Sequence, residues 1–194
     1  MKHIMLDLET LGTGYNAAIV AIGACEFDLP GPGAHNDENP ISHFYCKVDL
    51  PSSVAAGMEM DAPTVLWWMK QSEAARESTF EGLRTPLGDA LMRFNSWVYN
   101  IAPVAGRTEP DRADVWVWGN GATFDNVVIR SAFKAVRLTP CWSFRNDKCY
   151  RTVRDLLPKN RQPEFVKYGT AHNALDDAIA QALHLQKVWK ELGL

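Results

Sequence analysis

Asp7 and Glu9 are the first residues whose types and spacing could do chemistry. The segment Lys2 to Glu9 is typical of a β-strand, and side chains alternate along a strand, so the aliphatic residues face one way and the two acids the other. The strand rise separates the acids by roughly 6.6 Å, close enough to share bound cations. The alternative is that the face of the strand with the two acids is simply exposed to solvent. Because the chain begins with apolar residues, we expect this strand to be central in the sheet rather than at its edge.

Asp125, His172 and Asp177 each have an ordinary structural interpretation when taken alone. Asp125 follows a short apolar strand and a glycine-containing turn, where a carboxylate can simply cap the next helix. His172 and Asp177 stand at the entrance to the last helix, where first-turn acids are ordinary partners of the helix dipole. A D-x-E strand, an F-D helix start and an H-x(4)-D helix start, in this order, form a far more specific pattern.

This ordered set resembles the three motifs of the DnaQ-like exonucleases, the DEDDh branch of the ribonuclease H-like superfamily. The resemblance places Asp7 and Glu9 in the first motif, Asp125 in the second, and His172 with Asp177 in the third. Further segments, around 64–72, 118–121 and 151–152, resemble a small phage and bacterial group of exonuclease A and RNase AS type. Members of that group are divided between DNA and RNA substrates.

The resemblance implies 3′-5′ hydrolysis of terminal phosphodiester bonds, with release of nucleoside 5′-monophosphates. Asp7, Glu9, Asp125 and Asp177 would hold two Mg²⁺ or Mn²⁺ ions, which prefer hard oxygen ligands. His172 would act as general base, because a histidine side chain can take up a proton near neutral pH. The spacing of four residues after the histidine selects Asp177 over its neighbour.

Five further residues are expected to contact the substrate. The resemblance puts Thr10 and Leu11 near the terminal nucleotide and Phe124 at the edge of its pocket. Trp68 is a candidate stacking platform for a base, although core packing explains at least one of Trp67 and Trp68. Arg151 could contact phosphate, and a plain surface role is an equal alternative.

The elements that must position these residues follow from hydrophobic periodicity. Strands are expected over Lys2 to Glu9, Ala18 to Leu29, His43 to Leu50 and Val115 to Trp118, and exposed connections over Pro30 to Pro40 and Pro103 to Asp114. Helices are expected over Ala62 to Ser72, Pro86 to Ile101, Phe124 to Val136 and His172 to Leu192. This order predicts one α/β domain over residues 1–194, with a ribonuclease H-like mixed sheet flanked by helices.

Composition limits the partners and the compartment. Four scattered cysteines, no apolar run of membrane-spanning length and no signal-like start predict a cytoplasmic protein that does not bind membranes. The net charge of −3 disfavours extensive non-specific contact with a duplex. Ten Lys or Arg residues lie between Arg130 and Lys167 against three acids, which predicts a basic face or merely a solvated one.

The short basic segment predicts a preference for single-stranded 3′ ends, since a paired end must first be unstacked. The alternatives are an endonuclease or other phosphohydrolase on the same fold, and a non-catalytic nucleic-acid-binding module. The latter would lack one of the five motif residues, and all five are present. Relatives of this size often pair, so the resemblance also allows a homodimer.

Overall fold

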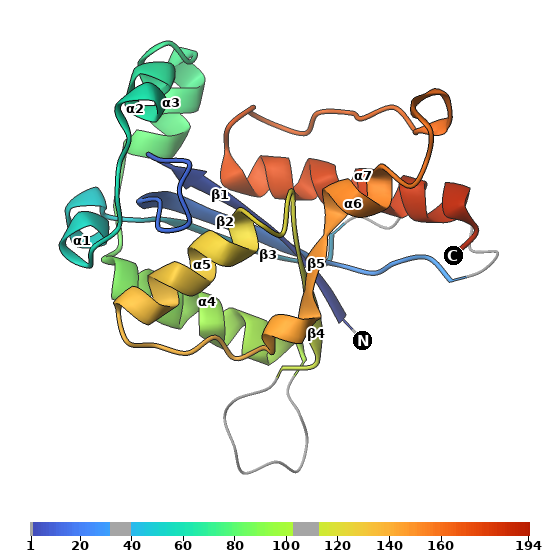
Figure 1. The fold of residues 1–194 in the computed structure, drawn as a ribbon, viewed down its shortest axis with the longest axis horizontal. Coiled ribbons are helices and arrows are strands. Elements are labelled where there is room, and N and C mark those ends of the chain that lie inside the picture. The colour runs from blue at the N-terminus through green and yellow to red at the C-terminus, as the bar shows by residue number, and fades with distance from the viewer. Residues whose placement is uncertain (1, 32–39, 103–112) are drawn as a thin grey trace.

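A five-stranded mixed sheet forms the centre of the protein, seen in a computed structural model that describes residues 2–31, 40–102 and 113–194 (Figure 1). Its order is β3-β2-β1-β4-β5. Strand β2 is antiparallel to both of its neighbours, β1 and β3. Strand β4 is parallel to both of its neighbours, β1 and β5. The strands are β1 (Lys2–Thr10), β2 (Ile19–Phe27), β3 (Ser42–Lys47), β4 (Val115–Gly119) and β5 (Asp147–Cys149). The first strand is central, as predicted.

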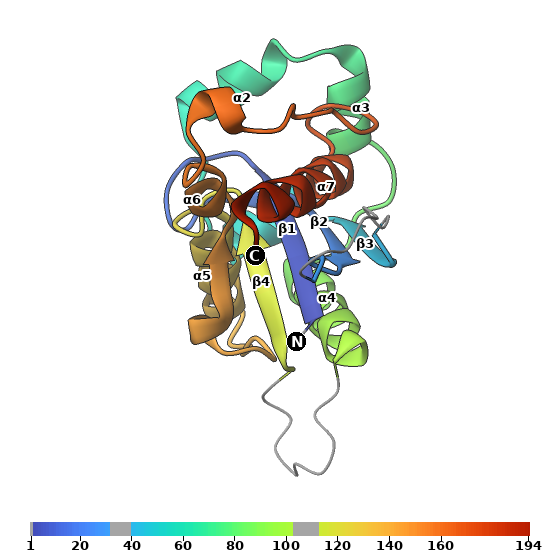
Figure 2. The same ribbon diagram turned by 90° about the vertical axis from the view of Figure 1, so that its right-hand side faces the viewer.

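Helices cover both faces of this sheet (Figures 1 and 2). On one face, α4 and α5 pack against the side chains of Ile4, Leu6 and Leu8, and on the other, α7 packs around Met5. The α-helices of the described residues are α1 (Leu50–Ala55), α2 (Ala62–Met69), α3 (Glu73–Phe80), α4 (Leu87–Ile101), α5 (Asp125–Ala135), α6 (Tyr150–Arg154) and α7 (Ala174–Leu192). Two short 3₁₀ turns lie at Phe144–Asn146 and Lys159–Arg161. The α/β fold and its flanking helices were predicted from the sequence.

Several boundaries differ from the sequence prediction for local reasons. The third strand ends at Lys47, because Asp49 accepts the backbone N–H of Ser52 and starts α1. The helix expected to reach Ser72 stops at Met69, because the Ser72 side chain caps a further helix, α3. The connections expected at Pro30 to Pro40 and Pro103 to Asp114 fall mostly outside the described residues.

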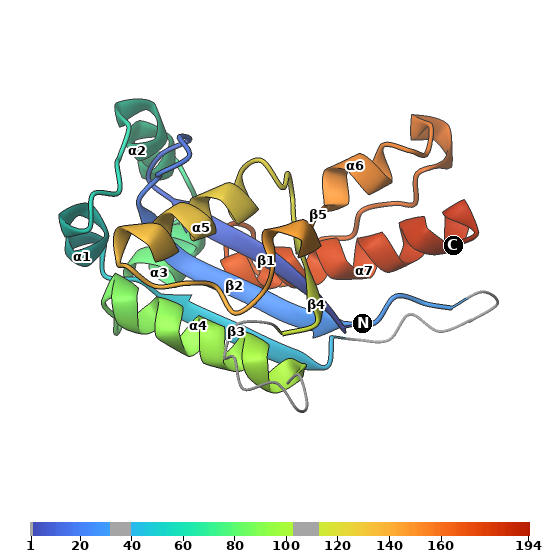
Figure 3. The ribbon, with the colours of Figure 1, turned by 60° about the horizontal axis from the view of Figure 1, so that its bottom comes forward.

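Helices α2 and α3 form a hairpin (Figures 1 and 2), and α2 lies near the carboxyl end of β1 (Figure 3). The Trp68 indole N–H of α2 donates to the Thr10 carbonyl at the end of β1, at 2.9 Å. From β3, the Tyr45 hydroxyl donates to the Ser78 carbonyl at 2.8 Å, and Lys47 Nζ donates to main-chain carbonyls near the end of α3. Hydrogen bonds therefore connect both helices of the hairpin to the sheet.

No helix in the described part of the chain has the length and apolar character needed to cross a membrane. All four cysteines are unpaired, and three of them are buried.

Candidate functional site

Three acids meet where β1 and β4 end. Asp7 and Glu9 point from β1 toward α7, opposite to the aliphatic residues of the same strand, as the alternation predicted. Because β1 and β4 run parallel, the turn after β4 brings Asp125 to the same edge. No side chain caps α5; the Asp125 carboxylate instead accepts the Leu8 backbone N–H at 3.3 Å.

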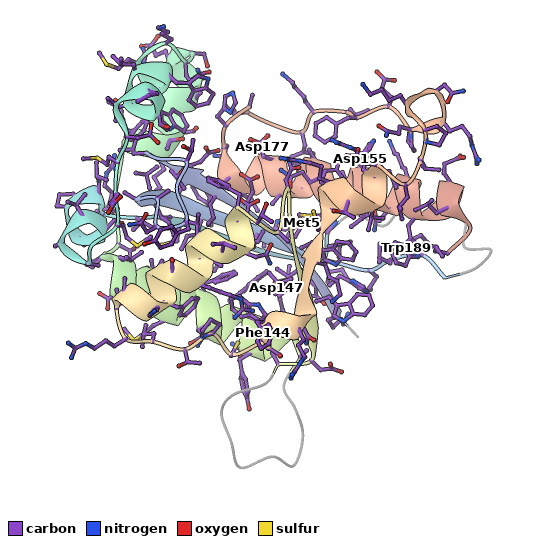
Figure 4. All side chains as sticks on the ribbon, viewed as in Figure 1. Met5, Phe144, Asp147, Asp155, Asp177 and Trp189 are labelled. Atoms are coloured by element: carbon purple, nitrogen blue, oxygen red, sulfur yellow. The ribbon has the colours of Figure 1, made fainter. Side chains whose placement is uncertain are left out.

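The fourth acid is delivered by the first turn of α7, which lies unusually close to the sheet. Gly23 pairs with Asp7 in the β1–β2 register. A Cβ atom at Gly23 would lie 2.1 Å from the Ala174 carbonyl carbon and 2.2 Å from the Leu175 nitrogen. The missing side chain therefore lets the α7 backbone rest directly on β2, which places Asp177 above β1 (Figure 4).

Asp7, Glu9 and Asp177 form the tightest group. One carboxylate oxygen from each lies within 4.8 Å of the others. Gln181, one turn beyond Asp177, donates its amide Nε2–H to Asp7 Oδ1 at 2.8 Å, which orients that carboxylate. Such a set of oxygen ligands suits a divalent cation such as Mg²⁺ or Mn²⁺.

The charges of this cluster are poorly compensated by the protein. Burial raises the pKa of Asp7 well above its ordinary value, and the nearby Asp125 and Glu9 carboxylates add to the rise. Burial and the charges of Asp177 and Asp125 raise the pKa of Glu9 to about 8, and burial raises that of Asp125 to about 7. Burial also raises the pKa of Asp177. A bound cation would stabilise the ionised forms of all four acids.

His172 lies just before α7 in a left-handed backbone conformation, with φ of 63°. Its backbone N–H donates to Asp177 Oδ2 at 3.0 Å, so the histidine and the acid of the third motif are directly linked. The imidazole packs edge-on against Trp67, with ring centroids 4.9 Å apart, and more distantly against Trp68.

The neighbouring Asp176 has a different role from Asp177. Its Oδ2 accepts the backbone N–H of Thr170 at 2.7 Å, which closes the turn that precedes His172. The tight three-acid group contains Asp177 and not Asp176. Asp177, the acid chosen from the motif spacing, is thus the one that lies with Asp7 and Glu9.

A cavity of about 460 Å³ opens beside the acids. Its walls include Glu9 and Thr10 of β1, Thr64 and Trp67 of α2, and Phe124 before α5. Residue Trp67 is 43% exposed, whereas Trp68 is only 3% exposed and packs with Leu11 and Val20. Of the two tryptophans, Trp67 presents the accessible ring, and Trp68 contributes a buried wall.

The other expected substrate contacts are distributed unevenly. Thr10 and Phe124 line the cavity, but Leu11 is 6% exposed and belongs to a small core cluster with Trp68. Arg151 lies outside the cavity. Its guanidinium donates to the Asn120 carbonyl at 2.9 Å, in the turn that leads to Asp125.

Comparison with known proteins decides the family. Residues 2–189 match the model of the 3′-5′ exoribonuclease Rv2179c-like domain. The chain belongs to this family. It is therefore a nuclease, a hydrolase that acts on phosphodiester bonds, and the motif resemblance seen in the sequence is confirmed.

Individual relatives of this Rv2179c-like chain include a phage exodeoxyribonuclease and solved structures of other nucleases. An exodeoxyribonuclease of Enterobacteria phage T4 is 26% identical, over 92% of this chain and 87% of that protein. Among solved structures, E. coli Exonuclease I in complex with a dT13 oligonucleotide has a TM-score of 0.57 and 18% identity over 96% of this chain. The matched part is 40% of the Exonuclease I chain.

The nuclease domain of 3′hExo, described as a DEDDh family member bound to rAMP, has a TM-score of 0.58 and 9% identity. Here the match covers 97% of this chain and 92% of that one. At such low identities these two structures support the fold, and they agree with the predicted ribonuclease H-like architecture.

Two residues that contact the motif residues of the Rv2179c-like site belong to no sequence motif. Gln181, which holds Asp7, is an ordinary polar residue in a long helix. Thr79, which donates to the His172 carbonyl at 3.1 Å, lies 93 positions away in α3. The helical spacing of four between Asp177 and Gln181 is the one hint that the sequence offers.

Proposed function

We propose that this chain removes nucleotides one at a time from single-stranded 3′ ends, using two divalent cations and His172. The observation that carries the proposal is the convergence of four acids and one histidine beside a cavity of about 460 Å³. One structural relative, E. coli Exonuclease I, is seen in complex with a dT13 oligonucleotide, which supports a single-stranded substrate.

The four acids act as the cation-binding groups. Asp7, Glu9 and Asp177 offer oxygens within 4.8 Å of one another, and Asp125 adds its charge next to Asp7. The hydrogen bond from Gln181 uses one carboxylate oxygen of Asp7, so the other oxygen stays available to a cation. Mg²⁺ or Mn²⁺ ions bound here would neutralise charge on the scissile phosphate and its attacking and leaving oxygens.

His172 acts as the general base. An imidazole nitrogen takes a proton from the attacking water, whose oxygen forms the new bond to phosphorus. The bond between phosphorus and the 3′ oxygen of the shortened strand breaks, and that oxygen receives a proton from solvent. The products are a nucleoside 5′-monophosphate and a strand one nucleotide shorter.

The cavity would receive the terminal nucleotide. Thr10, Trp68 and Phe124 form its wall, Leu11 supports it from behind, and the exposed Trp67 ring offers a face for stacking. Arg151 stands beside Asn120 and contributes positive charge next to Asp125. Of the ten basic residues between Arg130 and Lys167, three pair with acids, which lowers the positive charge that this segment offers to a nucleic acid strand.

The decisive experiment uses 5′-labelled and 3′-labelled RNA and DNA, as single strands and blunt duplexes, with Mg²⁺, Mn²⁺ or a chelator. We expect 3′-labelled single strands to release labelled mononucleotide from the first time point. Strands labelled at the 5′ end should shorten in single-nucleotide steps, and the chelator should stop both reactions.

Internal fragments from the 5′-labelled strands would show an endonuclease instead. Faster digestion of blunt duplex than of single strands, at equal salt and metal, would contradict the substrate proposal. The same panel separates RNA from DNA preference, on which the relatives differ. Light scattering of the purified protein tests the homodimer, which stays a prediction, as do the single domain over 1–194 and the cytoplasmic location.

A further inference from the structure

The backbone of His172 adopts a conformation that an ordinary residue avoids. Its φ of 63° lies in the left-handed region, where a side chain with a Cβ atom is disfavoured. Such a conformation persists when surrounding contacts fix it. The contacts that fix His172 therefore matter for any reaction that depends on where its imidazole lies.

Contacts from three helices meet at His172. Its N–H donates to Asp177 at the start of α7, and its carbonyl accepts the Thr79 hydroxyl of α3 at 3.1 Å. Trp67 of α2 contacts the imidazole at an interplanar angle of 83°. Both the main chain and the ring of His172 are thus in contact with the α2–α3 hairpin.

Thr79 is unusual for a hydroxyl residue inside a helix. Such residues commonly donate to a carbonyl of the preceding turn, as the adjacent Ser78 does to Ala75 at 2.9 Å. Thr79 is fully buried and donates instead to a carbonyl in a distant segment. Its hydroxyl serves the link to His172 rather than its own helix.

The helix that carries Thr79 is itself well anchored. The Tyr45 hydroxyl donates to the carbonyl of Ser78, the residue next to Thr79. Lys47 donates to the carbonyls of Glu77, at 3.2 Å, and Glu81, at 2.6 Å. Because these donors lie on β3, they fix the position of Thr79 relative to the sheet that also carries Asp7 and Glu9.

We propose that Thr79 is a positioning residue for His172, and that Trp67 assists it by limiting the orientation of the imidazole. This inference rests on the proposed role of His172 as general base. The Thr79 hydroxyl fixes the carbonyl of the left-handed residue relative to the sheet, and the Trp67 ring bounds one side of the imidazole. The acids need neither contact, because their positions follow from β1, α5 and α7.

Thr79→Val removes the hydroxyl and keeps the shape of the side chain. We expect kcat to fall roughly 10- to 100-fold, as for a modest displacement of a catalytic group. KM and Mn²⁺ affinity should stay within about twofold, since the acid cluster is untouched. Thr79→Ser restores the hydroxyl and should recover most of kcat. Ser78→Ala, which removes the neighbouring hydroxyl bond within α3, is the matched control and should keep kcat.

A second measurement is independent of activity. In histidine-ring NMR spectra of the whole protein, the His172 signal is identified by its loss in His172→Asn. Thr79→Val should shift or broaden this signal and leave those of the buried His3 and His184 unchanged. If the wild-type chain degrades no strand, the proposed function fails, while the spectra still show whether Thr79 holds His172.

Three results would overturn the inference. The first is wild-type kcat and an unchanged His172 signal in Thr79→Val. The second is an equal loss of kcat in Ser78→Ala, which would indicate general damage to α3. The third is failure of Thr79→Ser to recover activity although its melting temperature matches that of the wild type.

Discussion

The acid cluster and the segment around His172 lie side by side, but different parts of the fold hold them. Asp7 and Glu9 belong to the central strand, and Asp177 to a helix packed on the sheet through Gly23. The main chain and ring of His172, by contrast, contact a peripheral hairpin through Thr79 and Trp67. In the proposed function, cation binding and proton transfer thus depend on separate parts of the fold.

Because the two groups have separate supports, we expect that a mutation can impair proton transfer by His172 without impairing cation binding by the acids. Damage to the sheet or to α7 should affect cation binding and, through it, turnover. Damage to the hairpin should affect turnover alone. The backbone hydrogen bond between His172 and Asp177 is a described contact that joins the two supports.

The largest expected effect comes from removing an acid. Asp177→Asn should lower kcat by roughly a thousandfold or more, because several kcal/mol of charge stabilisation depend on the cations. Calorimetric titration with Mn²⁺ should show weaker binding. Asp176→Asn is the control, since Asp176 binds the Thr170 N–H outside the cluster, and should be far milder. Reversed effects would show that the third motif is misaligned.

His172→Asn should separate the two supports most clearly. Asparagine tolerates the left-handed backbone but cannot act as the base, so kcat should fall about 10²- to 10⁴-fold. Mn²⁺ binding and the melting temperature should stay close to those of the wild type. Loss of Mn²⁺ binding in the titration would make His172 a ligand and would remove the distinction between the two regions.

Gly23→Ala should damage the cation-binding support without touching a motif residue. The added Cβ meets main-chain atoms of Ala174 and Leu175, so α7 must move away from β2. Overpacking of this kind costs about 1–3 kcal/mol, and Mn²⁺ affinity should weaken together with stability. Gly88→Ala is the control, because its Cβ meets no atom within 4 Å. Unchanged Mn²⁺ binding in Gly23→Ala would refute the proposed role of this close approach.

The smallest effect concerns pH and stability. The pKa of Glu9 is raised from 4.5 to about 8, so the folded, cation-free protein holds more protons than the unfolded chain between these values. Its free energy of unfolding should therefore fall as pH rises through that window. Saturating Mn²⁺, at about a hundred times its Kd, adds about 2.7 kcal/mol, or roughly 5–10 °C in melting temperature.

Calorimetric melting curves with Mn²⁺ or a chelator at pH 5.5 and pH 8 would measure this effect. The cation should stabilise the protein more at pH 8, where the acids ionise more readily, than at pH 5.5. Equal stabilisation at both pH values would mean that the raised pKa values do not describe the cation site.

The parts of the fold that the sequence predicts are those with strong periodicity. The central strands and the amphipathic α4, α5 and α7 were predicted within a few residues of their bounds. The missed elements are short. Strand β5 has three residues and α6 has five, too few for a period to show, and α3 has little apolar content beyond Phe80.

The residues of the site also fall into two groups, those that the sequence indicates and those that it does not. Its motif residues stand on long elements in a fixed order, so a single sequence indicates them. Gln181 and Thr79 are defined by contacts that span 174 and 93 positions, and no local pattern encodes such contacts. Trp67 and Trp68 are adjacent in a largely apolar helix, and packing against Thr10 and Leu11 distinguishes the buried residue from the exposed one.

The left-handed backbone at His172 also has a consequence for how this family can evolve. Glycine and asparagine occupy such a conformation at lower cost than histidine does. With His172 in its proposed role as general base, selection for turnover would maintain a residue that the local backbone disfavours. In a gene copy freed from that selection, substitution by Gly or Asn at this position would be favoured by folding alone. Such a substitution alone would leave the four acids in place and remove the proposed general base.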